Sequence, residues 1–404
     1  MRDGDERARE TGGRARDTGG LAWLEALGPQ KIRPGLTRTL ALLEALDRPD
    51  RAFRSLLVGG TNGKGSTAAT ASALLAAAGV PVGLYTSPHL VSVTERVRIG
   101  EADVARGDLS RALLEVAAVA GSGDDAPTYF EALTVAAFVL FRRARTQVAV
   151  VEVGIGGLLD ATNVLDAEVA IVTNVGADHL ETLGPTLSDV ARQKAGIFRP
   201  GAAALTAADG ESLEVLHEEA VRLGTRLFDV GPAEPLDDVI ALPGAHQRVN
   251  AALAVGAASG FARLSPEIVR EALPRVRWRG RLETLERPGR RTLLLDGAHN
   301  PHGIEALAAH LDRAALSGRV DLVFGGLADK DLAGMLAPLV PRAARIVFTR
   351  PPSPRAEDPA ALAARFPGSS AVDSPEEAVR ALDGGPDDPP LLVAGSLYLV
   401  GEVL

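Results

Sequence analysis

The segment VGGTNGKGSTAAT, residues 58–70, places glycines, one lysine and several hydroxyl side chains between an apolar run and an alanine-rich stretch. Glycines let backbone N–H groups turn toward an anion, and the amino end of a following helix adds a positive field. A strand-to-helix turn without a ligand has little need for Lys64 and two hydroxyls, so the segment predicts nucleotide binding.

Within this loop we expect Lys64 to reach the outer phosphates and Ser66 or Thr67 to face a magnesium ion. Gly65 stands between Lys64 and Ser66, whereas the commonest nucleotide-binding pattern places Ser or Thr directly after Lys. The residues assigned to the nucleotide loop are Thr61, Asn62, Gly63, Lys64, Gly65, Ser66 and Thr67.

Polar side chains also follow three other apolar runs, as Ser87 in YTSPHL, Glu152 in VEVGIGG, and Asp178 with His179 in GADHLETLG. Ligands of a parallel sheet collect at the carboxyl edge of its strands. A carboxylate that ends a buried run is costly unless a cation or hydrogen bonds meet it. Glu152 therefore predicts a ligand to metal or to a bridging water, with a hydrogen-bonded helix cap as the alternative.

Short apolar runs alternate with longer helix-like segments, such as 66–79 and 129–144. The runs lack in-and-out alternation, which is typical of strands buried on both faces of a parallel sheet wrapped by helices. The expected strands are 53–58, 81–86, 147–154, 168–176 and 202–207 in a first series, and 292–297, 320–326, 344–349 and 390–396 in a second.

The length of 404 residues suits two domains. A charged stretch with Gly and Pro separates the two strand series, so we expect a boundary near residue 282. Residues 1–20 alternate charges with Gly pairs and predict a disordered tail. The remaining chain then forms a first domain over 21–282 and a second over 283–404.

Composition excludes several classes of protein. A net charge of −9 with few clustered Lys or Arg argues against a nucleic-acid surface. The chain has no Cys, which excludes disulfides and thiolate zinc sites. The first twenty residues contain no apolar segment, so we expect neither signal peptide nor membrane span. These features are typical of a cytoplasmic enzyme that acts on small molecules.

The order of several motifs resembles the folylpolyglutamate synthase and dihydrofolate synthase family, relatives of the Mur ligases. The resemblance runs from about Lys31 to the C-terminus, and the Gly between Lys and Ser in the phosphate loop is also similar to this superfamily. It implies an α/β protein with a P-loop ATPase domain built on a mainly parallel sheet and a smaller Rossmann-like C-terminal domain. The motifs are GTNGKGST, LYTSPHL, TYFEALT, EVGIGGLLDATN, DHLETLGPTLSDVARQKAGI, HQRVN, RGRLE, DGAHNP and GSLYLVGEV.

The resemblance implies ATP-driven amide bond formation. A substrate carboxylate would attack the γ-phosphate of ATP to give an acyl phosphate and ADP, and the amine of L-glutamate would then displace phosphate. Two magnesium ions are implied, with Ser87 and Glu152 serving the first and His179 the second. Lys64 and His179 are then catalytic residues.

Lys194, in DVARQKAGI, is implied to be a catalytic residue carbamylated by carbon dioxide. The modification turns a cation that would repel magnesium into an anion that can assist it. The alternative is an unmodified surface lysine at a helix end.

The resemblance also distributes the other ligands. Asn250 is implied to meet adenine, Arg281 a phosphate and Asp296 the ribose, although Arg281 also suits a linker salt bridge and Asp296 a turn. His299 and Ser396 are placed at the glutamate site.

For the pterin side, the residues assigned are Thr128, Tyr129, Phe130, Glu131, Leu158 and Asp160. Tyr129 and Phe130 equally suit a helix core, and Asp160 equally suits a turn cap. Many bifunctional members have Arg where Leu158 stands, which removes a hydrogen-bonding partner for the pterin.

We therefore expect glutamate addition to folate, while Leu158 leaves addition to dihydropteroate open. The expected partners are folate or dihydropteroate and L-glutamate, with no nucleic acid, no membrane and a monomeric chain. Two rival hypotheses are a ligase of the same architecture for a non-folate acid, and a nucleotide-dependent binding or kinase-like protein.

Overall fold

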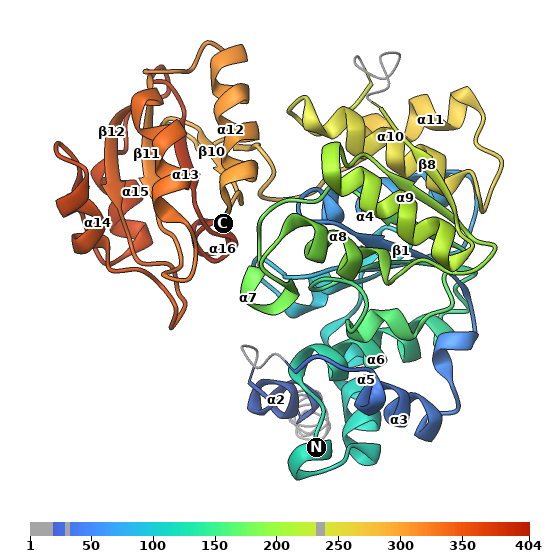
Figure 1. Cartoon of the computed structure of the whole chain (residues 1–404). Coiled ribbons are helices and arrows are strands. Elements are labelled where there is room, and N and C mark those ends of the chain that lie inside the picture. The colour runs from blue at the N-terminus through green and yellow to red at the C-terminus, as the bar shows by residue number, and fades with distance from the viewer. Residues whose placement is uncertain (1–18, 29–32, 232–238) are drawn as a thin grey trace, which may run out of the picture. The chain divides into compact units, whose positions relative to one another are not determined.

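A computed structural model describes residues 19–28, 33–231 and 239–404, and these form two compact units (Figure 1). The predicted disordered tail lies, up to residue 18, outside the described residues. Among the described residues, unit 1 comprises 19–87, 93–231 and 250–273, and unit 2 comprises 88–92, 239–249 and 274–404. The domain boundary that the sequence predicts near residue 282 stays a prediction.

Unit 1 is built on an eight-stranded sheet in the order β4-β3-β2-β5-β1-β6-β7-β8. The six strands from β2 to β8 in this order run parallel, while β3 pairs antiparallel with β2 and β4 with β3. The strands are β1 Arg54–Gly59, β2 Val82–Tyr85, β3 Val97–Ile99, β4 Ala102–Asp103, β5 Val148–Glu152, β6 Val169–Val172, β7 Ala203–Thr206 and β8 Arg226–Asp229.

All five strands predicted for this unit are confirmed. Each was recognisable in the sequence because its residues are apolar and lie buried in the sheet. The sequence analysis missed β3, β4 and β8. These strands have two to four residues and lie toward the sheet edges, where exposed residues weaken the apolar signal.

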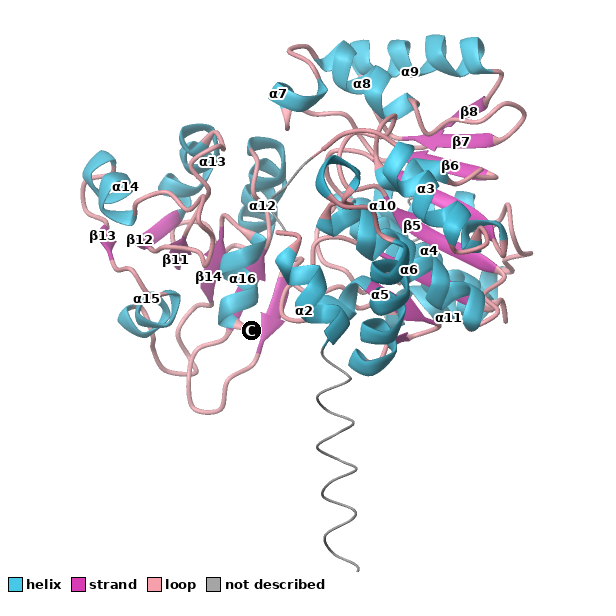
Figure 2. Ribbon diagram, turned by 90° about the horizontal axis from the view of Figure 1, so that it is seen from below, coloured by secondary structure: helices cyan, strands magenta, loops and turns pink. Residues whose placement is uncertain are grey.

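Helices cover both faces of this sheet (Figure 2). The two helices predicted at 66–79 and 129–144 are confirmed as α4 and α6, with α4 starting two residues earlier. The helices are α2 Gly19–Ala26, α3 Thr37–Ala45, α4 Lys64–Ala77, α5 Arg106–Val119, α6 Tyr129–Arg143, α7 Leu180–Leu183, α8 Leu187–Ala195, α9 Gly210–Leu223, α10 His246–Ala258 and α11 Pro266–Ala272.

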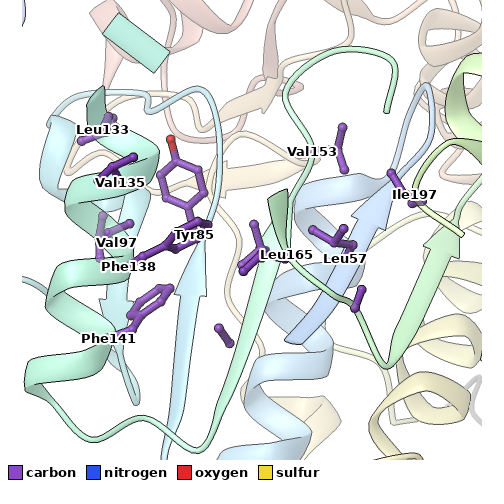
Figure 3. Close-up of a cluster of buried hydrophobic side chains, with 14 of the residues drawn as sticks. Leu57, Tyr85, Val97, Leu133, Val135, Phe138, Phe141, Val153, Leu165 and Ile197 are labelled. Carbon is purple, nitrogen blue, oxygen red and sulfur yellow. The ribbon is translucent and has the colours of Figure 1, made fainter. Parts of the chain in front are cut away.

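The core of unit 1 fixes α6 against β2 (Figure 3). Phe138 and Phe141 of α6 are fully buried, and a Cβ at Gly83 of β2 would lie only 2.5 Å from the Phe141 ring. The Tyr85 hydroxyl lies 3.0 Å from Thr134 Oγ1 of α6. Because β2 is held in this way, the loop that follows it starts from a fixed position.

Unit 2 contains a six-stranded sheet in the order β13-β12-β11-β14-β10-β9. The four predicted strands are confirmed and run parallel, whereas the short strands β9, antiparallel to β10, and β13 were missed. The strands are β9 Glu283–Leu285, β10 Leu293–Asp296, β11 Val320–Phe324, β12 Ala343–Phe348, β13 Ser370–Ala371 and β14 Leu391–Ala394. The helices are α12 Pro301–Arg313, α13 Leu332–Leu339, α14 Pro359–Arg365, α15 Pro375–Ala381 and α16 Leu397–Val403.

Both units thus have the predicted α/β architecture with mainly parallel sheets. No helix in the described part of the chain is long and apolar enough to cross a membrane.

Candidate active site

The carboxyl edge of the unit 1 sheet brings four of the predicted segments together. Strand β5 lies between β2 and β1, with Glu152 opposite Val58 and Val151 opposite Tyr85. Strand β6 flanks β1 on its other side. Because these strands are parallel and neighbouring, the phosphate loop, Ser87, Glu152 and the segment after β6 all begin at one edge.

Two glycines of the phosphate loop have left-handed backbone conformations, with φ of +135° at Gly60 and +81° at Gly63. A Cβ at Gly60 would lie 1.8 Å from Thr173 Oγ1, and one at Gly63 would lie 2.5 Å from Asn250 Oδ1. The loop is therefore packed between Thr173 and Asn250. Asn250, predicted to meet adenine, is 5% exposed and lies directly against the loop.

Hydrogen bonds to the segment after β6 fix the loop further. The Asn62 carbonyl accepts from Thr173 Oγ1 at 2.6 Å and from Asn174 Nδ2 at 3.0 Å. Thr61 Oγ1 accepts from the Gly176 N–H at 2.9 Å. The sequence analysis missed Thr173 and Asn174, although both follow an apolar strand, the signal that identified Ser87.

Lys64 closes over its own loop, since its Nζ donates to the carbonyls of Gly60 at 3.2 Å and Thr61 at 3.1 Å. Ser66 and Thr67 are buried in the first turn of α4. Within the described residues, Thr67 Oγ1 is buried and has no hydrogen-bond partner. A buried hydroxyl without a hydrogen-bond partner is suited to contact a bound group that the chain itself does not supply.

Glu152 and Ser87, predicted to share one metal site, contact each other. The Ser87 N–H donates to Glu152 Oε2 at 2.9 Å, and Glu152 is only 4% exposed. The donor belongs to the loop after β2 and not to a helix end. The carboxylate is therefore oriented by the segment that carries the second predicted metal ligand.

Lys194 is buried in α8, with 3% of its surface exposed, so the alternative of a surface lysine is wrong. The pKa of Lys194 falls to about 7, because burial and the positive charge of Lys64 lower it, while Asp178 acts in the opposite direction. These charges influence one another because the fold gathers them at the same edge. A lysine with this pKa is partly neutral near pH 7, which suits reaction with carbon dioxide.

His179 begins α7 in a left-handed conformation with a φ of +55°. Its N–H donates to Asp178 Oδ1 at 3.0 Å, and its Nε2 lies 3.9 Å from the same oxygen. The His179 side chain is 36% exposed, whereas that of Asp178 is 10% exposed. Asp178 thus holds the turn that presents the imidazole.

The possible metal donors are few. No group of three or more His, Cys, Asp or Glu side chains suited to a metal ion occurs in the described part of the chain. Ser87 and Glu152 offer the oxygen ligands that Mg²⁺ prefers, and Mg²⁺ is commonly held by one or two protein oxygens plus substrate phosphates. The donor set therefore fits a magnesium ion whose coordination a bound nucleotide completes.

Two residues predicted for the pterin side, Thr128 and Glu131, form the capping box of α6. Arg38 binds the Glu131 carboxylate through two hydrogen bonds of 3.0 and 2.7 Å. The sequence analysis did not predict this contact, because Arg38 lies 93 residues away in the chain. Both predicted residues thus stabilise the start of α6, and their contact with substrate stays a prediction.

The two aromatic residues of this motif differ in exposure. Tyr129 is buried in the core, with the Arg96 guanidinium 5.5 Å from its ring centre. Phe130 is partly buried beside Tyr85, and a Cβ at Gly154 would lie 2.8 Å from its ring. Phe130 therefore borders the loop after β5, whereas Tyr129 supports the helix from inside.

Asp160 caps a turn. Its carboxylate accepts from the Ile155 N–H at 2.9 Å and from the N–H and hydroxyl of Thr162 at 3.0 and 2.6 Å. Burial raises its pKa, and these hydrogen bonds act in the opposite direction. The alternative of a turn cap is confirmed, and the carboxylate organises the loop that carries Leu158. The Leu158 side chain is 46% exposed.

In unit 2, Asp296 ends strand β10, and Ser396 follows the neighbouring strand β14. The Asp296 carboxylate accepts from the N–H groups of Leu282 and Ala298, both at 2.9 Å, and burial raises its pKa while Arg281 acts in the opposite direction. Ser396 Oγ caps α16 by accepting from the Tyr398 N–H at 3.1 Å.

Arg281 and His299, which lie beside these residues in the chain, have polar partners on the main chain. Arg281 donates to the Gly280 carbonyl at 3.0 Å and forms no ion pair with the described residues, so the linker salt bridge is wrong. His299 Nδ1 lies 2.8 Å from the Gly297 carbonyl and must carry a proton to donate there.

Comparison with known proteins agrees with this arrangement. The model described as Mur ligase middle domain matches residues 58–238, and the one described as Mur ligase, glutamate ligase domain matches residues 280–397. The dihydrofolate synthase/folylpolyglutamate synthase of Bacillus subtilis is 30% identical over 419 residues, covering 95% of this chain and 97% of that protein. The chain belongs to the folylpolyglutamate synthase and dihydrofolate synthase family of Mur ligases.

Solved structures of this family superpose over nearly the whole chain. Escherichia coli FolC in complex with DHPP and ADP has a TM-score of 0.86 and 31% identity, covering 95% of this chain and 96% of that one. The Yersinia pestis bifunctional folylpolyglutamate synthase/dihydrofolate synthase complexed with AMPPNP and Mn ion has a TM-score of 0.84 and 33% identity, covering 95% and 96%.

Some relatives are longer than this chain. The probable bifunctional folylpolyglutamate synthase/dihydropteroate synthase of Haloferax volcanii is 36% identical, and the match covers 92% of this chain but only 48% of that protein. The chain therefore spans about half the length of this relative.

Proposed function

We propose that this chain is an ATP-dependent ligase that adds L-glutamate to a folate through an acyl phosphate. The observation that carries the proposal is the gathering of a phosphate loop, Glu152 and a buried Lys194 at one sheet edge, in a chain of the folylpolyglutamate synthase family. A ligase for a non-folate acid is less well supported, because the relatives that cover most of this chain carry folate names.

The residues of the sheet edge divide the work of activating the substrate carboxylate. Backbone N–H groups of the loop hold the nucleotide phosphates, and Lys64 leaves its loop carbonyls to meet the negative charge that develops on the transferred phosphoryl group. Asn250, packed on the loop, is proposed to contact the adenine. These groups act by position and charge, since phosphoryl transfer needs little covalent help from the protein.

Ser87, Glu152 and Thr67 are proposed to hold the magnesium ion that accompanies the nucleotide. When bound, divalent metal supplies charge neutralisation for the phosphates. Glu152 is already oriented for this by the Ser87 N–H, so little reorganisation is required.

Lys194 is proposed to carry the carbamate. Its pKa of about 7 provides the neutral amine that attacks carbon dioxide, forming an N–C bond and releasing a proton. The resulting carboxylate removes a positive charge beside Lys64 and adds an oxygen donor. We propose that it serves a second magnesium ion together with His179.

The second substrate is proposed to bind at the carboxyl edge of the unit 2 sheet. The glutamate ligase description covers residues 280–397, which include His299 and Ser396. Arg281 and Asp296 are proposed to contact the phosphate and ribose of the nucleotide. The predicted monomeric state and cytoplasmic location remain predictions.

ADP release measured with and without L-glutamate tests the proposal. We expect release that depends on both a folate and L-glutamate, with a product one glutamyl residue longer by mass. Glutamate-independent ADP release would favour the kinase-like alternative. Release with a non-folate acid, and none with folates, would favour the alternative ligase.

A further inference from the structure

The opposite edge of the unit 1 sheet carries an open hollow of about 630 Å³. Its lining consists of residues 51–54, at the start of β1, Arg142 at the end of α6, and residues 145–147, just before β5. These segments precede the strands whose other ends carry the phosphate loop and Glu152. Five residues of strand separate the two edges by about 16 Å.

The lining is strongly basic, with four arginines and no carboxylate: Arg51, Arg54, Arg142 and Arg145. Arg54 is neutralised by Glu168 through hydrogen bonds of 2.8 and 2.7 Å, and its guanidinium lies 4.7 Å from the Phe261 ring centre. Arg54 therefore forms part of the wall and leaves three guanidinium groups to face the hollow.

These three guanidinium groups have no carboxylate partner among the described residues. Arg142 donates only to the carbonyls of Leu46 and Asp47, at 3.0 and 3.1 Å, which leaves its charge uncompensated. Arg51 and Arg145 form no ion pair in that part of the chain.

Several acidic side chains of the adjoining segments have cationic partners outside the lining, and the exposed Asp47, whose carbonyl binds Arg142, forms no ion pair with the described lining arginines. Asp50 and Glu44 are bound by Arg48, and Glu115 is bound by Arg143. Among the described residues, no ion pair therefore offsets the charge of Arg51, Arg142 or Arg145.

Two further features separate this hollow from an ordinary basic surface. Thr146, between Arg145 and Gln147, is 4% exposed, and its hydroxyl has no hydrogen-bond partner among the described residues. Arg145 has a left-handed backbone with a φ of +53°, at a position after a helix where Gly is the usual residue. The backbone itself gives no reason for an arginine there.

We propose that this hollow binds a small molecule with at least two adjacent anionic oxygen groups, at a site separate from the nucleotide site. Guanidinium groups match phosphate and carboxylate oxygens in paired hydrogen bonds, and three of them suit a ligand with about three negative charges. The Phe53 ring, held edge-on by Phe138 and Phe141 at 5.8 and 5.7 Å, gives the hollow a rigid apolar wall.

Titration calorimetry of the full chain with tripolyphosphate and, separately, with citrate tests this site. The titrations use the Lys64→Ala chain to weaken anion binding at the phosphate loop, and the arginine variants show which part of the binding belongs to the hollow. We expect binding of at least one probe, weakened by salt because the contacts are charged. A preference for tripolyphosphate would identify phosphate groups as the source of the oxygens, and a preference for citrate would identify carboxylates.

The same titrations in Arg145→Gly and Arg51→Ala backgrounds locate the site. Each change should weaken binding about tenfold, because each removes one charge-assisted contact. Gly suits the backbone of residue 145, so the fold should be retained, which thermal unfolding checks. Arg226→Ala, which removes an exposed arginine from the far edge strand β8, is the matched control and should leave affinity unchanged.

Absence of binding by both probes would overturn the proposal. So would equal weakening by Arg226→Ala and Arg145→Gly, because binding would then reflect overall charge. Ligase activity of Arg145→Gly without added anion should equal that of the unaltered chain, whichever way the proposed function is decided.

Discussion

The carboxyl edges of the two sheets are both lined with polar residues, but they treat charge differently. In unit 2, Asp296 and Ser396 accept hydrogen bonds from backbone N–H groups and hold turns in place. In unit 1, Lys194 is buried near a second lysine, and its pKa falls to about 7. The comparison indicates that these unit 2 side chains hold the backbone in place. Unit 1 instead keeps a lysine whose positive charge is unfavourable, and a ligand or modification can remove this unfavourable interaction.

The largest effect is expected from removing a charge at the unit 1 edge. Lys64→Ala or Glu152→Ala should lower glutamate-dependent ADP release by about 10³-fold, because each group acts where phosphoryl charge develops. Steady-state assays measure this, and thermal unfolding should show an intact fold. Turnover within tenfold of the unaltered chain would remove these residues from the active site.

Lys194→Met should stabilise the protein at low pH, measured as the free energy of unfolding in buffers free of carbon dioxide. The folded pKa of about 7 lies below the ordinary 10.5, so the unfolded state holds the proton more tightly. The destabilisation by buried, charged Lys194 is complete below pH 7, shrinks as pH rises from 7 toward 10.5, and is at most about 5 kcal/mol.

The advantage of Lys194→Met should therefore fade over that pH range. If the stabilisation by Lys194→Met does not change between pH 7 and 10.5, the pKa of Lys194 is not lowered in the folded protein. The contrast between the two sheet edges would then fail.

Lys194→Ala should lower turnover roughly 100-fold through loss of an oxygen ligand. Added short carboxylic acids should restore part of the activity, because they can occupy the vacated space and supply the oxygen. Lys194→Met, which fills that space, is the control and should resist rescue. Rescue of both variants to the same extent would argue against a carbamate.

Leu158→Arg tests the pterin side of the same edge. The exposed Leu158 side chain has no hydrogen-bond donor for a pterin. Arg should therefore raise kcat/KM for dihydropteroate by a factor that corresponds to roughly 1 to 3 kcal/mol of transition-state stabilisation. Glutamate addition to a folate that already carries glutamate should change little. Efficient use of dihydropteroate by the unaltered chain, with no gain in the variant, would show that Leu158 is compatible with both activities.

The smallest effect is expected in unit 2. Ser396→Ala removes the cap of α16 and should lower the free energy of unfolding by about 1 kcal/mol. Turnover should fall less than tenfold, because the hydroxyl is engaged with the Tyr398 N–H. A loss of 100-fold without a change in stability would place Ser396 in the chemistry.

The sequence alone identified nine strands inside the two sheets, because a strand buried on both faces must be apolar along its length, but it missed the short strands toward the sheet edges. It also identified the phosphate loop, because glycines, Lys64 and hydroxyls in that spacing have few other uses. The strand pattern also placed Ser87 and Glu152 at one edge, whereas their pairing at one metal site was implied only by the family resemblance.

Only the tertiary structure decided the contacts between segments that carry no periodic signal. Arg38 binds Glu131, 93 residues away in the chain, and Lys194 is buried from solvent because neighbouring elements cover α8. The basic hollow likewise joins arginines from the starts of two strands with one from a helix end. Burial and charge proximity depend on how elements pack, and a pattern of residue types along the chain does not specify that packing.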